Sequence, residues 1–517
     1  MPSKHEKVFA ALVQFGFLPR ATKHADEIPP LFNSLGFSPK IAREIASHPL
    51  RGGQGYDALR VNATRHNLAI RSLSIAHPAS YSHLSNLIVD EWDNIRHISK
   101  NRRSRARPAA TKGSRRFAMT ETNRMPVPNV HHRYVVSADI GQFYDSIYTH
   151  AIAWALVGRK TAKQNVFTKP APWYNQLDKL VRYMKRNETT GIIIGPATST
   201  VMGELVLGAI DDRLKGFQYS RFVDDYTAFC DSETEALDFL TALRVALADY
   251  NLALNPRKTR IRALPTSVTP KWIRELRRLT PKRFLTSSQE IEDILDEAIE
   301  LIDEDIDTSA LVWALRAAEP SFAALERRAA EKIRTRLLHL AARRAPVVPF
   351  LCRFYTQTGI DASVDKASLK AILLSQLNEG RSDCALWVAY LLLSSDIPLG
   401  SKVIRALVSH GDALTLTLMG TSTSAPARRA AIAFATDLTS SKLDDYDRDR
   451  YWMLLYELYK RDEVTLGKYV DKSFEILKRE DVSFVDWKRR KLRPSEARMP
   501  RFPRPYLLVG GSGGSPD

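Results

Sequence analysis

Two segments that read as β-strands carrying aspartates constrain the fold of this chain more than any other feature. The first, YVVSAD, is a run of β-branched, aromatic and small residues from Tyr134 to Ala138 that ends at Asp139. In the second, RFVDDYTAFC, apolar runs flank Asp224 and Asp225. Short apolar runs of this composition predict buried strands. We therefore expect a sheet that brings three carboxylates together from distant parts of the sequence.

The second segment predicts a hairpin with its two aspartates at the tip. Successive side chains of a strand point to opposite faces, so we expect Asp224 to be the main ligand of an ion and Asp225 to support it. Aspartate is also common in ordinary hairpin turns, which leaves a plain turn as the alternative. The same dipeptide recurs at Asp211-Asp212 and Asp444-Asp445, where we expect a solvated loop or helix face.

A cluster of carboxylates from separate strands has a specific chemical use. Such a cluster can hold two divalent cations, which align an attacking hydroxyl and stabilise charge on phosphate groups. Nucleotidyl transfer needs this arrangement. We therefore expect Asp139, Asp224 and Asp225 to be catalytic and to bind two Mg²⁺ ions, with Mn²⁺ as an alternative.

Four segments follow one another in an order that suggests a family. They are SADIGQFYDSI, GIIIGPATSTVMGELVLGAID, RFVDDY and YNLALNPRKTRI. Together they resemble motifs A, B, C and D of a reverse transcriptase palm, over residues 134–262 and more weakly upstream to about residue 17. In the bacterial abortive-infection, or defence-associated, reverse transcriptases, motif C often follows an arginine, as at Arg221. Motif B there has the form Gly-Pro-x-x-Ser. The resemblance implies an RNA-directed DNA polymerase of α+β fold.

The resemblance also implies roles for individual residues near the carboxylates. Asp139 and Asp224 match the two metal-binding aspartates, Asp225 matches the second aspartate of motif C, and the backbone carbonyl of Ile140 would complete the coordination. Tyr144 matches an aromatic steric gate, whose ring would crowd a ribose 2′-hydroxyl and so favour dNTPs over NTPs. The alternative for Tyr144 is a core tyrosine at the turn from strand to helix.

Two more motifs are carried over in the same way. Gly195, Pro196 and Ser199 match the motif B turn beside the incoming nucleotide, where glycine allows close approach of the backbone. Ile194 stands where retroviral and intron enzymes have glutamine, so conventional handling of a template stays open. Lys258 matches the motif D lysine, placed to neutralise or protonate the leaving pyrophosphate. Its alternative is an ordinary solvated lysine.

Basic residues point to polyanionic partners. The net charge is +18, and basic side chains concentrate in residues 99–116 and 487–504. Such a balance favours nucleic acid or nucleotides as partners, although a basic run is often only a solvated face or a flexible arm. Lys112, Arg115 and Arg116 in TKGSRRFAM are candidates for fingers residues that grip the triphosphate, because guanidinium groups form forked contacts with phosphate oxygens.

Cysteine content and hydropathy predict the cellular environment. Three widely spaced cysteines argue against a disulfide framework and for a reducing compartment. No convincing signal peptide precedes the first apolar helix, and no apolar run is long enough to span a membrane. We therefore expect no membrane partner and, with the resemblance, a cytoplasmic bacterial location.

Composition divides the chain into five segments. We expect an N-terminal segment with fingers at 1–133, a palm at 134–264, a linker or primer-contacting element at 265–290, a helical domain at 291–480, and a basic tail with a flexible Gly/Ser-rich end at 481–517. Helical periodicity separated by short polar breaks suggests HEAT-like repeats after the palm. The predicted helices after residue 320 are 323–344, 365–378, 382–394, 401–409, 427–437, 447–460 and 466–479.

Three functions remain open at this point. The first is a DNA polymerase in antiphage defence that adds dNTPs, for which priming from a protein hydroxyl and synthesis without a conventional template both stay open. The second is a templated reverse transcriptase of intron or retron type, and the third is a non-catalytic nucleic-acid-binding scaffold. The first would give single-stranded DNA covalently attached to the protein, and Tyr56, expected in a mobile glycine-rich segment, is the candidate for priming. A homo-oligomer is a further expected partner.

Overall fold

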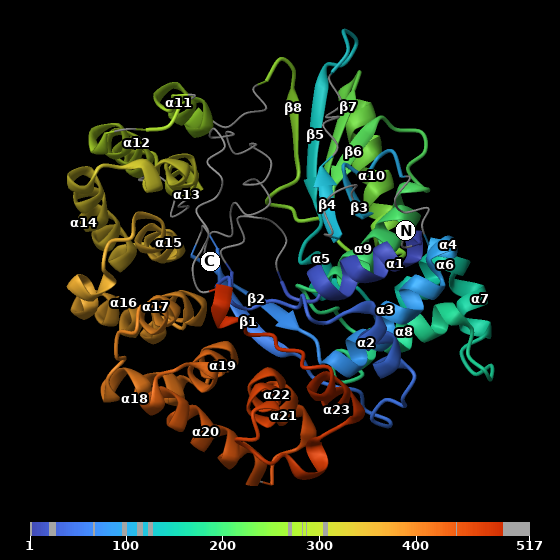
Figure 1. Cartoon of the computed structure of the whole chain (residues 1–517). Helices are drawn as coiled ribbons and strands as arrows, with labels where there is room; N and C mark the ends of the chain where they lie inside the picture. The colour runs from blue at the N-terminus through green and yellow to red at the C-terminus, as the bar shows by residue number, and fades with distance from the viewer. Residues whose placement is uncertain are drawn as a thin grey trace.

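The computed structural model describes residues 3–19, 27–65, 68–95, 101–110, 117–121, 128–266, 271–281, 283–285, 287–302, 309–440 and 442–489. We divide them into an N-terminal part (residues 3–133), a palm part (134–264) and a helical array (271–489). Figure 1 shows the three parts side by side, with the array following an arc around one side of the molecule.

The N-terminal part combines helices with two small hairpins. The β1–β2 hairpin and the β3–β4 hairpin are both antiparallel. Helix α3 begins directly after His77, whose ring nitrogen accepts a hydrogen bond from the backbone N–H of Ala79 and so caps the helix. The elements are α1 Lys4–Ala10, a π-helical turn Ala11–Phe15, α2 Pro39–Ala46, β1 Leu59–Thr64, β2 Ile70–Ile75, α3 Pro78–Asp90, α4 Trp92–Ile95, β3 Ala106–Ala110 and β4 Phe117–Glu121.

The palm part is built on a four-stranded antiparallel sheet in the order β6-β7-β5-β8. The register pairs Val136 with Ala228 and Ile261, so these three side chains lie on one face, where α9 and α10 help to cover the sheet. The opposite face carries Asp139 and Asp225. The elements are β5 Tyr134–Asp139, α5 Phe143–Ser146, α6 His150–Val157, α7 Arg159–Gln164, α8 Trp173–Tyr183, α9 Ala197–Asp211, β6 Tyr219–Phe222, β7 Asp225–Cys230, α10 Glu233–Ala248 and β8 Arg260–Ala263.

The helical array has two layers. Helices α12, α14, α16, α18 and α20 contact one another in succession, and α15, α17 and α19 form a second row beside them. The helices are α11 Lys271–Leu279, α12 Ser288–Glu300, α13 Ser309–Ala318, α14 Arg327–Arg343, α15 Val348–Thr358, α16 Lys366–Asn378, α17 Ser382–Ser394, α18 Ser401–His410, α19 Ala413–Thr421, α20 Ala425–Ser440, α21 Asp445–Asp449, α22 Trp452–Lys460 and α23 Lys472–Arg479; 3₁₀ turns lie at Glu319–Ala324, Ala345–Val347, Ala362–Asp365, Gly467–Tyr469 and Trp487–Arg489.

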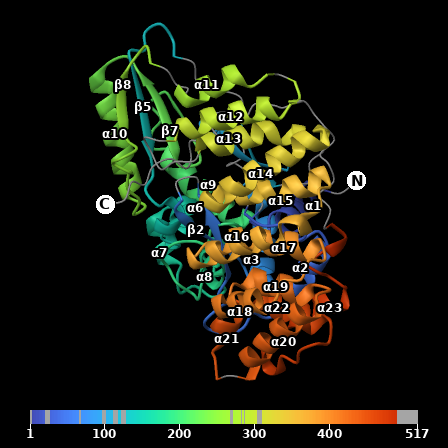
Figure 2. The same cartoon turned by 90° about the vertical axis from the view of Figure 1, so that its left-hand side faces the viewer.

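The sequence explains which helices form the second row. Every residue of α17 from Ser382 to Leu393 is buried, and α19 is buried along its whole length. A helix that is apolar on all sides must be covered on all sides. In contrast, α14 and α18 bury only one stripe and expose basic or polar residues on the other. Figure 2 shows the array from its outer side.

The end of the array packs back onto the N-terminal part. Helix α23 contacts α2 and α3, and α17 and α19 contact β1. The rings of Phe17, Trp452 and Phe484 lie within 5.2–5.9 Å of one another, and the Trp452 indole N–H donates to the carbonyl of Ile75. One apolar core includes residues of all three parts. We call the contact between the end of the array (α17 to α23) and the N-terminal part the brace, because it connects the two ends of the chain.

Some predicted helix boundaries are wrong. Residues 447–460 form two helices, because the chain breaks at Arg450 and Tyr451, and α23 begins only at Lys472, where Asp471 caps its first turn through two backbone N–H groups. The helices α15 and α19 were not predicted. Helix α11 lies in the expected linker and packs on α12 and α13 through Ile273 and Leu276. Among the described helices, none combines the length and apolar character that crossing a membrane requires.

Candidate active site

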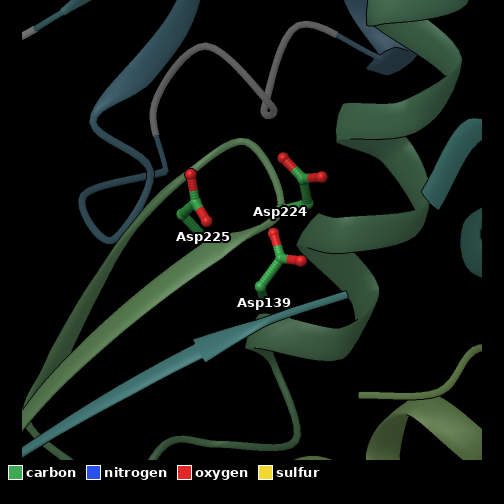
Figure 3. A group of neighbouring side chains, drawn as sticks. All are labelled: Asp139, Asp224 and Asp225. Atoms are coloured by element: carbon green, nitrogen blue, oxygen red, sulfur yellow. The ribbon is translucent and has the colours of Figure 1, made fainter. Parts of the chain in front are cut away.

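Three carboxylates converge at the edge of the palm sheet. Asp139 ends β5 and lies directly opposite Asp225 on β7, while Asp224 lies in the turn between β6 and β7. Each offers one oxygen atom, and these atoms all lie within 4.8 Å of one another. Figure 3 shows the three side chains gathered at the ends of their segments. The predicted hairpin is confirmed. Asp224 belongs to the turn, where strand alternation does not apply, so the ranking of Asp224 above Asp225 as a ligand stays a prediction.

The electrostatics of this cluster favour a cation. Burial, and after it the nearby charge of Asp139, raises the pKa of Asp224 to about 6. Burial also raises the pKa of Asp225, and the charges of Asp224 and Asp139 act in the same direction. Lys258 Nζ lies 3.3 Å from an Asp139 carboxylate oxygen and offsets part of this charge. Hard oxygen ligands with excess negative charge suit divalent cations such as Mg²⁺ or Mn²⁺, so the residues present fit the expected ions.

Backbone contacts hold the two acidic segments together. The Ile140 N–H donates to the carbonyl of Asp224 at 3.3 Å, and the Asn255 N–H donates to the carbonyl of Asp139 at 2.7 Å. The Asn255 side-chain amide also donates to the Asp139 carboxylate at 3.2 Å. Sequence reasoning did not assign a role to Asn255. Its place three residues before Lys258 was the available signal.

Tyr144 lies beside the cluster and packs against helix α9. A Cβ added at Gly203 would lie 3.3 Å from the Tyr144 ring. Burial raises the pKa of Tyr144, and the charges of Asp224 and Glu204 contribute in the same direction. The partial burial of Tyr144 against the core is the packing that the alternative expected, and its role as a steric gate stays a prediction.

The motif B turn is held against the N-terminal part. Gly195 has φ +134°, and a Cβ there would lie 2.7 Å from the carbonyl oxygen of Ser74 on β2. The Ser74 N–H donates to the carbonyl of Ile194 at 2.7 Å. Pro196 then precedes α9, and Ser199 is buried in its first turn. The close approach that glycine permits here is therefore made to β2.

Strand β2 also brings positive charge near the acids. The charge of Arg71 lowers the pKa of both Asp224 and Tyr144, opposing the larger effect of burial. Arg71 is the strand partner of Ala63, next to the β1–β2 turn. Sequence reasoning missed Arg71, because nothing in the sequence shows that this hairpin lies beside the palm.

Two arginines lie on the same face of the sheet as the carboxylates. Ser137 pairs with Thr227 on β7 and with Arg260 on β8, and Val135 pairs with Arg262. Since side chains two residues apart share a face, Arg260 and Arg262 share the face of Asp139. Both arginines are exposed.

Other predictions have different outcomes. Lys112, Arg115 and Arg116 lie outside the described residues. Priming requires an exposed hydroxyl, and Tyr56 does not offer one: the residue is 2% exposed, its ring stacks on His77, and its hydroxyl accepts from the Arg51 N–H at 3.1 Å.

The expectation that Asp211 lies on a solvated surface is also wrong. Asp211 is buried and accepts a hydrogen bond from Arg221, whereas Asp212 is exposed as expected. Asp211 is the last residue of α9 and faces β6, whereas Asp212, which follows it, is exposed to solvent.

Comparison with known proteins agrees with this geometry. Residues 82–286 match the family model described as reverse transcriptase (RNA-dependent DNA polymerase). This chain contains a reverse transcriptase domain. The domain spans the palm motifs and both acidic segments, so the protein is a nucleotidyltransferase of the reverse transcriptase type.

Two further comparisons complete the findings. Apo telomerase from Candida tropicalis is 12% identical with a TM-score of 0.30, and the match covers 66% of this chain and 69% of the telomerase chain. A similarity at this level carries no functional argument. No curated protein matches the chain.

Proposed function

We propose that the protein adds dNTPs to a hydroxyl group by two-metal nucleotidyl transfer, and that it does so in antiphage defence. The observation that carries the chemistry is the convergence of Asp139, Asp224 and Asp225 within 4.8 Å. Two Mg²⁺ ions bound there would activate the attacking hydroxyl and stabilise charge on the phosphates. The carbonyl of Ile140 would add a ligand beside Asp139.

The residues around the cluster position the nucleotide. Tyr144 would exclude a ribose 2′-hydroxyl, and the turn of Gly195, Pro196 and Ser199 would support the base and the opposing strand. Lys258, which pairs with Asp139, would neutralise or protonate the leaving pyrophosphate once cations occupy the acids. Lys112, Arg115 and Arg116 remain candidates for gripping the triphosphate.

Nucleic acid would cross the open face of the palm sheet. Arg260 and Arg262 lie on the face of the carboxylates and are exposed, so they would contact phosphates of RNA or of the single-stranded DNA product. Such contacts weaken steeply with salt. Loss of binding at moderate salt in Arg260→Ala/Arg262→Ala, compared with the unchanged protein, would support this path.

The resemblance of motifs B and C supports the defence role, untemplated synthesis and priming from a protein hydroxyl. We also infer that the two-layer array is a HEAT-like repeat domain, that the protein is located in the bacterial cytoplasm, and that it forms a homo-oligomer. Because Tyr56 is buried, a priming hydroxyl would come from another residue or would require local opening around Tyr56.

One experiment tests the proposal. The purified protein is incubated with Mg²⁺ and labelled dNTPs, with and without an RNA template and primer, and the products are separated by denaturing electrophoresis before and after protease treatment. Label that stays with the protein until proteolysis supports protein priming. Product that forms only with template, is complementary to it and migrates freely supports the intron or retron type. Incorporation that survives Asp224→Ala/Asp225→Ala would refute the site.

A further inference from the structure

A fully buried arginine lies directly behind the metal-binding turn. Arg221, on β6, is 0% exposed. Its guanidinium donates to both carboxylate oxygens of Glu204, at 2.9 and 3.0 Å, and to Asp211 at 2.8 Å. The two acids lie on α9, the helix that follows the motif B turn. A buried charge persists only where such partners compensate for lost water, so β6 is fixed to α9 at this point.

The same guanidinium reaches the turn itself. Arg221 Nη1 donates to the carbonyl of Val223 at 3.3 Å. Val223 has φ +55°, a left-handed conformation that is strongly disfavoured for a β-branched side chain. Strained backbone persists only where the surroundings over-determine it. The hydrogen bond to the Val223 carbonyl supplies such a constraint, one residue before Asp224.

The backbone of Arg221 links a further segment to the site. Its N–H donates to the carbonyl of Arg103 at 2.9 Å, and the Arg105 N–H donates to the Arg221 carbonyl at 2.7 Å. Arg103 also donates to the backbone carbonyl of Asp211 at 2.7 Å. The segment 101–105 leads directly into β3 and therefore ties the β3–β4 hairpin to the strand that carries the metal-binding turn.

We propose that Arg221 is a positioning residue for the nucleotidyl transfer reaction. By joining α9, β6 and the Val223 carbonyl, it holds the strained turn in the form that directs Asp224 toward Asp139 and Asp225. Because Arg221 is 0% exposed, it would act without touching the substrate or the ions. Its contribution is to keep the three carboxylates arranged for cations in spite of their mutual repulsion.

The chemistry of the contacts makes arginine necessary. A guanidinium forms bonds in several directions in one plane, and here it reaches two carboxylates and one carbonyl at once. The ammonium of lysine keeps the charge but lacks this fork. The variant Arg221→Lys should therefore preserve much of the charge balance with α9 while losing the bond to the Val223 carbonyl.

The test compares two buried arginines in the full-length protein. Arg353 pairs with Glu319 at 2.6 Å and is also buried, and it lies on α15 in the array, which Figure 1 shows apart from β6. Arg221→Lys and Arg353→Lys are purified, their melting temperatures are measured, and Mn²⁺ binding is followed by electron paramagnetic resonance. Mg²⁺ titrations of dNTP incorporation then give kcat and KM well below the melting temperatures.

Both variants should melt at a lower temperature. Only Arg221→Lys should raise the Mn²⁺ dissociation constant and the half-saturating Mg²⁺ concentration, by about tenfold for the loss of one charge-assisted hydrogen bond, with KM for dNTP changing less than kcat. If Arg221→Lys binds Mn²⁺ within twofold of the unchanged protein, the proposal is overturned and Arg221 is structural only.

A second variant keeps the proposal testable if Arg221→Lys does not fold. Glu204→Gln keeps the size of the side chain and weakens its hold on the guanidinium, so it should weaken Mn²⁺ binding in the same direction; unchanged binding would overturn the proposal. The Mn²⁺ measurement also separates this inference from the polymerase function, because it requires no incorporation. Asp224→Ala/Asp225→Ala provides the reference in which the cluster is absent.

Discussion

Two regions of this molecule surround aspartates in opposite ways. In the palm, Asp224 and Asp225 face a third carboxylate, Asp139, within 4.8 Å. Where the array meets the N-terminal part, Asp449 is fully buried. It accepts hydrogen bonds from the Arg51 guanidinium and, at 2.9 Å each, from the backbone N–H of Asp57 and the hydroxyl of Tyr469.

The comparison shows what distinguishes the candidate metal site in the palm from the structural ion pair of Asp449. The pKa values of Asp224 and Asp449 are both raised to about 6, and burial is the largest cause for each. A raised pKa therefore does not identify the active site by itself. The causes other than burial distinguish the two regions. A second carboxylate, Asp139, raises the pKa of Asp224, whereas the hydrogen-bond partners of Asp449 all lower its pKa. Acids that face other acids and are only partly compensated by cations of the protein mark the place for metal ions.

The largest expected effect comes from removing the acids in each region. Asp224→Asn/Asp225→Asn should reduce dNTP incorporation by about a thousandfold, because metal stabilisation of the transition state contributes several kcal/mol. The melting temperature should stay the same or rise, since like charges are removed. Asp449→Asn should do the reverse, with a lower melting temperature and nearly unchanged kcat. If the palm variant melts early while Asp449→Asn abolishes turnover, the contrast between the regions fails.

The next effect concerns the contribution of the Arg51–Asp449 ion pair to the free energy of unfolding. Arg51→Met leaves Asp449 buried without its cation, which should cost about 3–5 kcal/mol of unfolding free energy. Urea unfolding followed by the tryptophan fluorescence of the array measures it. Arg327→Met, in an exposed pair with Glu331, is the control and should cost less than about 1 kcal/mol. Equal costs would mean that burial does not set the value of the ion pair.

A smaller effect compares two glycines with positive φ. Gly195 in the palm has φ +134° and a Cβ position 2.7 Å from a backbone oxygen, whereas Gly359 in the array has φ +70° and open space. Gly359→Ala should cost about 1 kcal/mol through backbone conformation alone. Gly195→Ala should cost more, by about 1–3 kcal/mol of additional strain, and should also lower kcat because the motif B turn must move. Similar losses of stability for both variants would contradict the close approach to β2.

The smallest effect is a pH dependence of metal binding. In the folded, metal-free protein the pKa of Asp224 lies near 6, above the unfolded value of about 3.9. The folded state then binds more protons between these values, so its stability falls as pH rises through them. Cations bind the ionised form, so the increase in melting temperature produced by Mg²⁺ should be larger at pH 8 than at pH 5.5. In Asp224→Asn/Asp225→Asn this difference should disappear; an increase independent of pH in the unchanged protein would show that Mg²⁺ acts elsewhere.

Much of the site could be predicted from local sequence. Tyr134 to Asp139 forms the predicted strand, Asp224 and Asp225 lie at the predicted hairpin, and α17 has the predicted bounds. These features depend on short-range patterns: β-branched runs, turn residues and helical periodicity. The wrong prediction for Asp211 shows the limit, because its partner Arg221 is ten residues away and on another element.

The sequence by itself determined the identities and the order of the acids, since strand and turn preferences act over a few residues. Tertiary structure alone decided their surroundings: Asn255 and Lys258 at Asp139, Arg221 behind the turn, and the burial of Tyr56 under the end of the array. The physical reason is that burial and charge compensation depend on which distant segments pack together. The packing is set by the shared apolar core of the three parts, and short-range sequence patterns do not predict it.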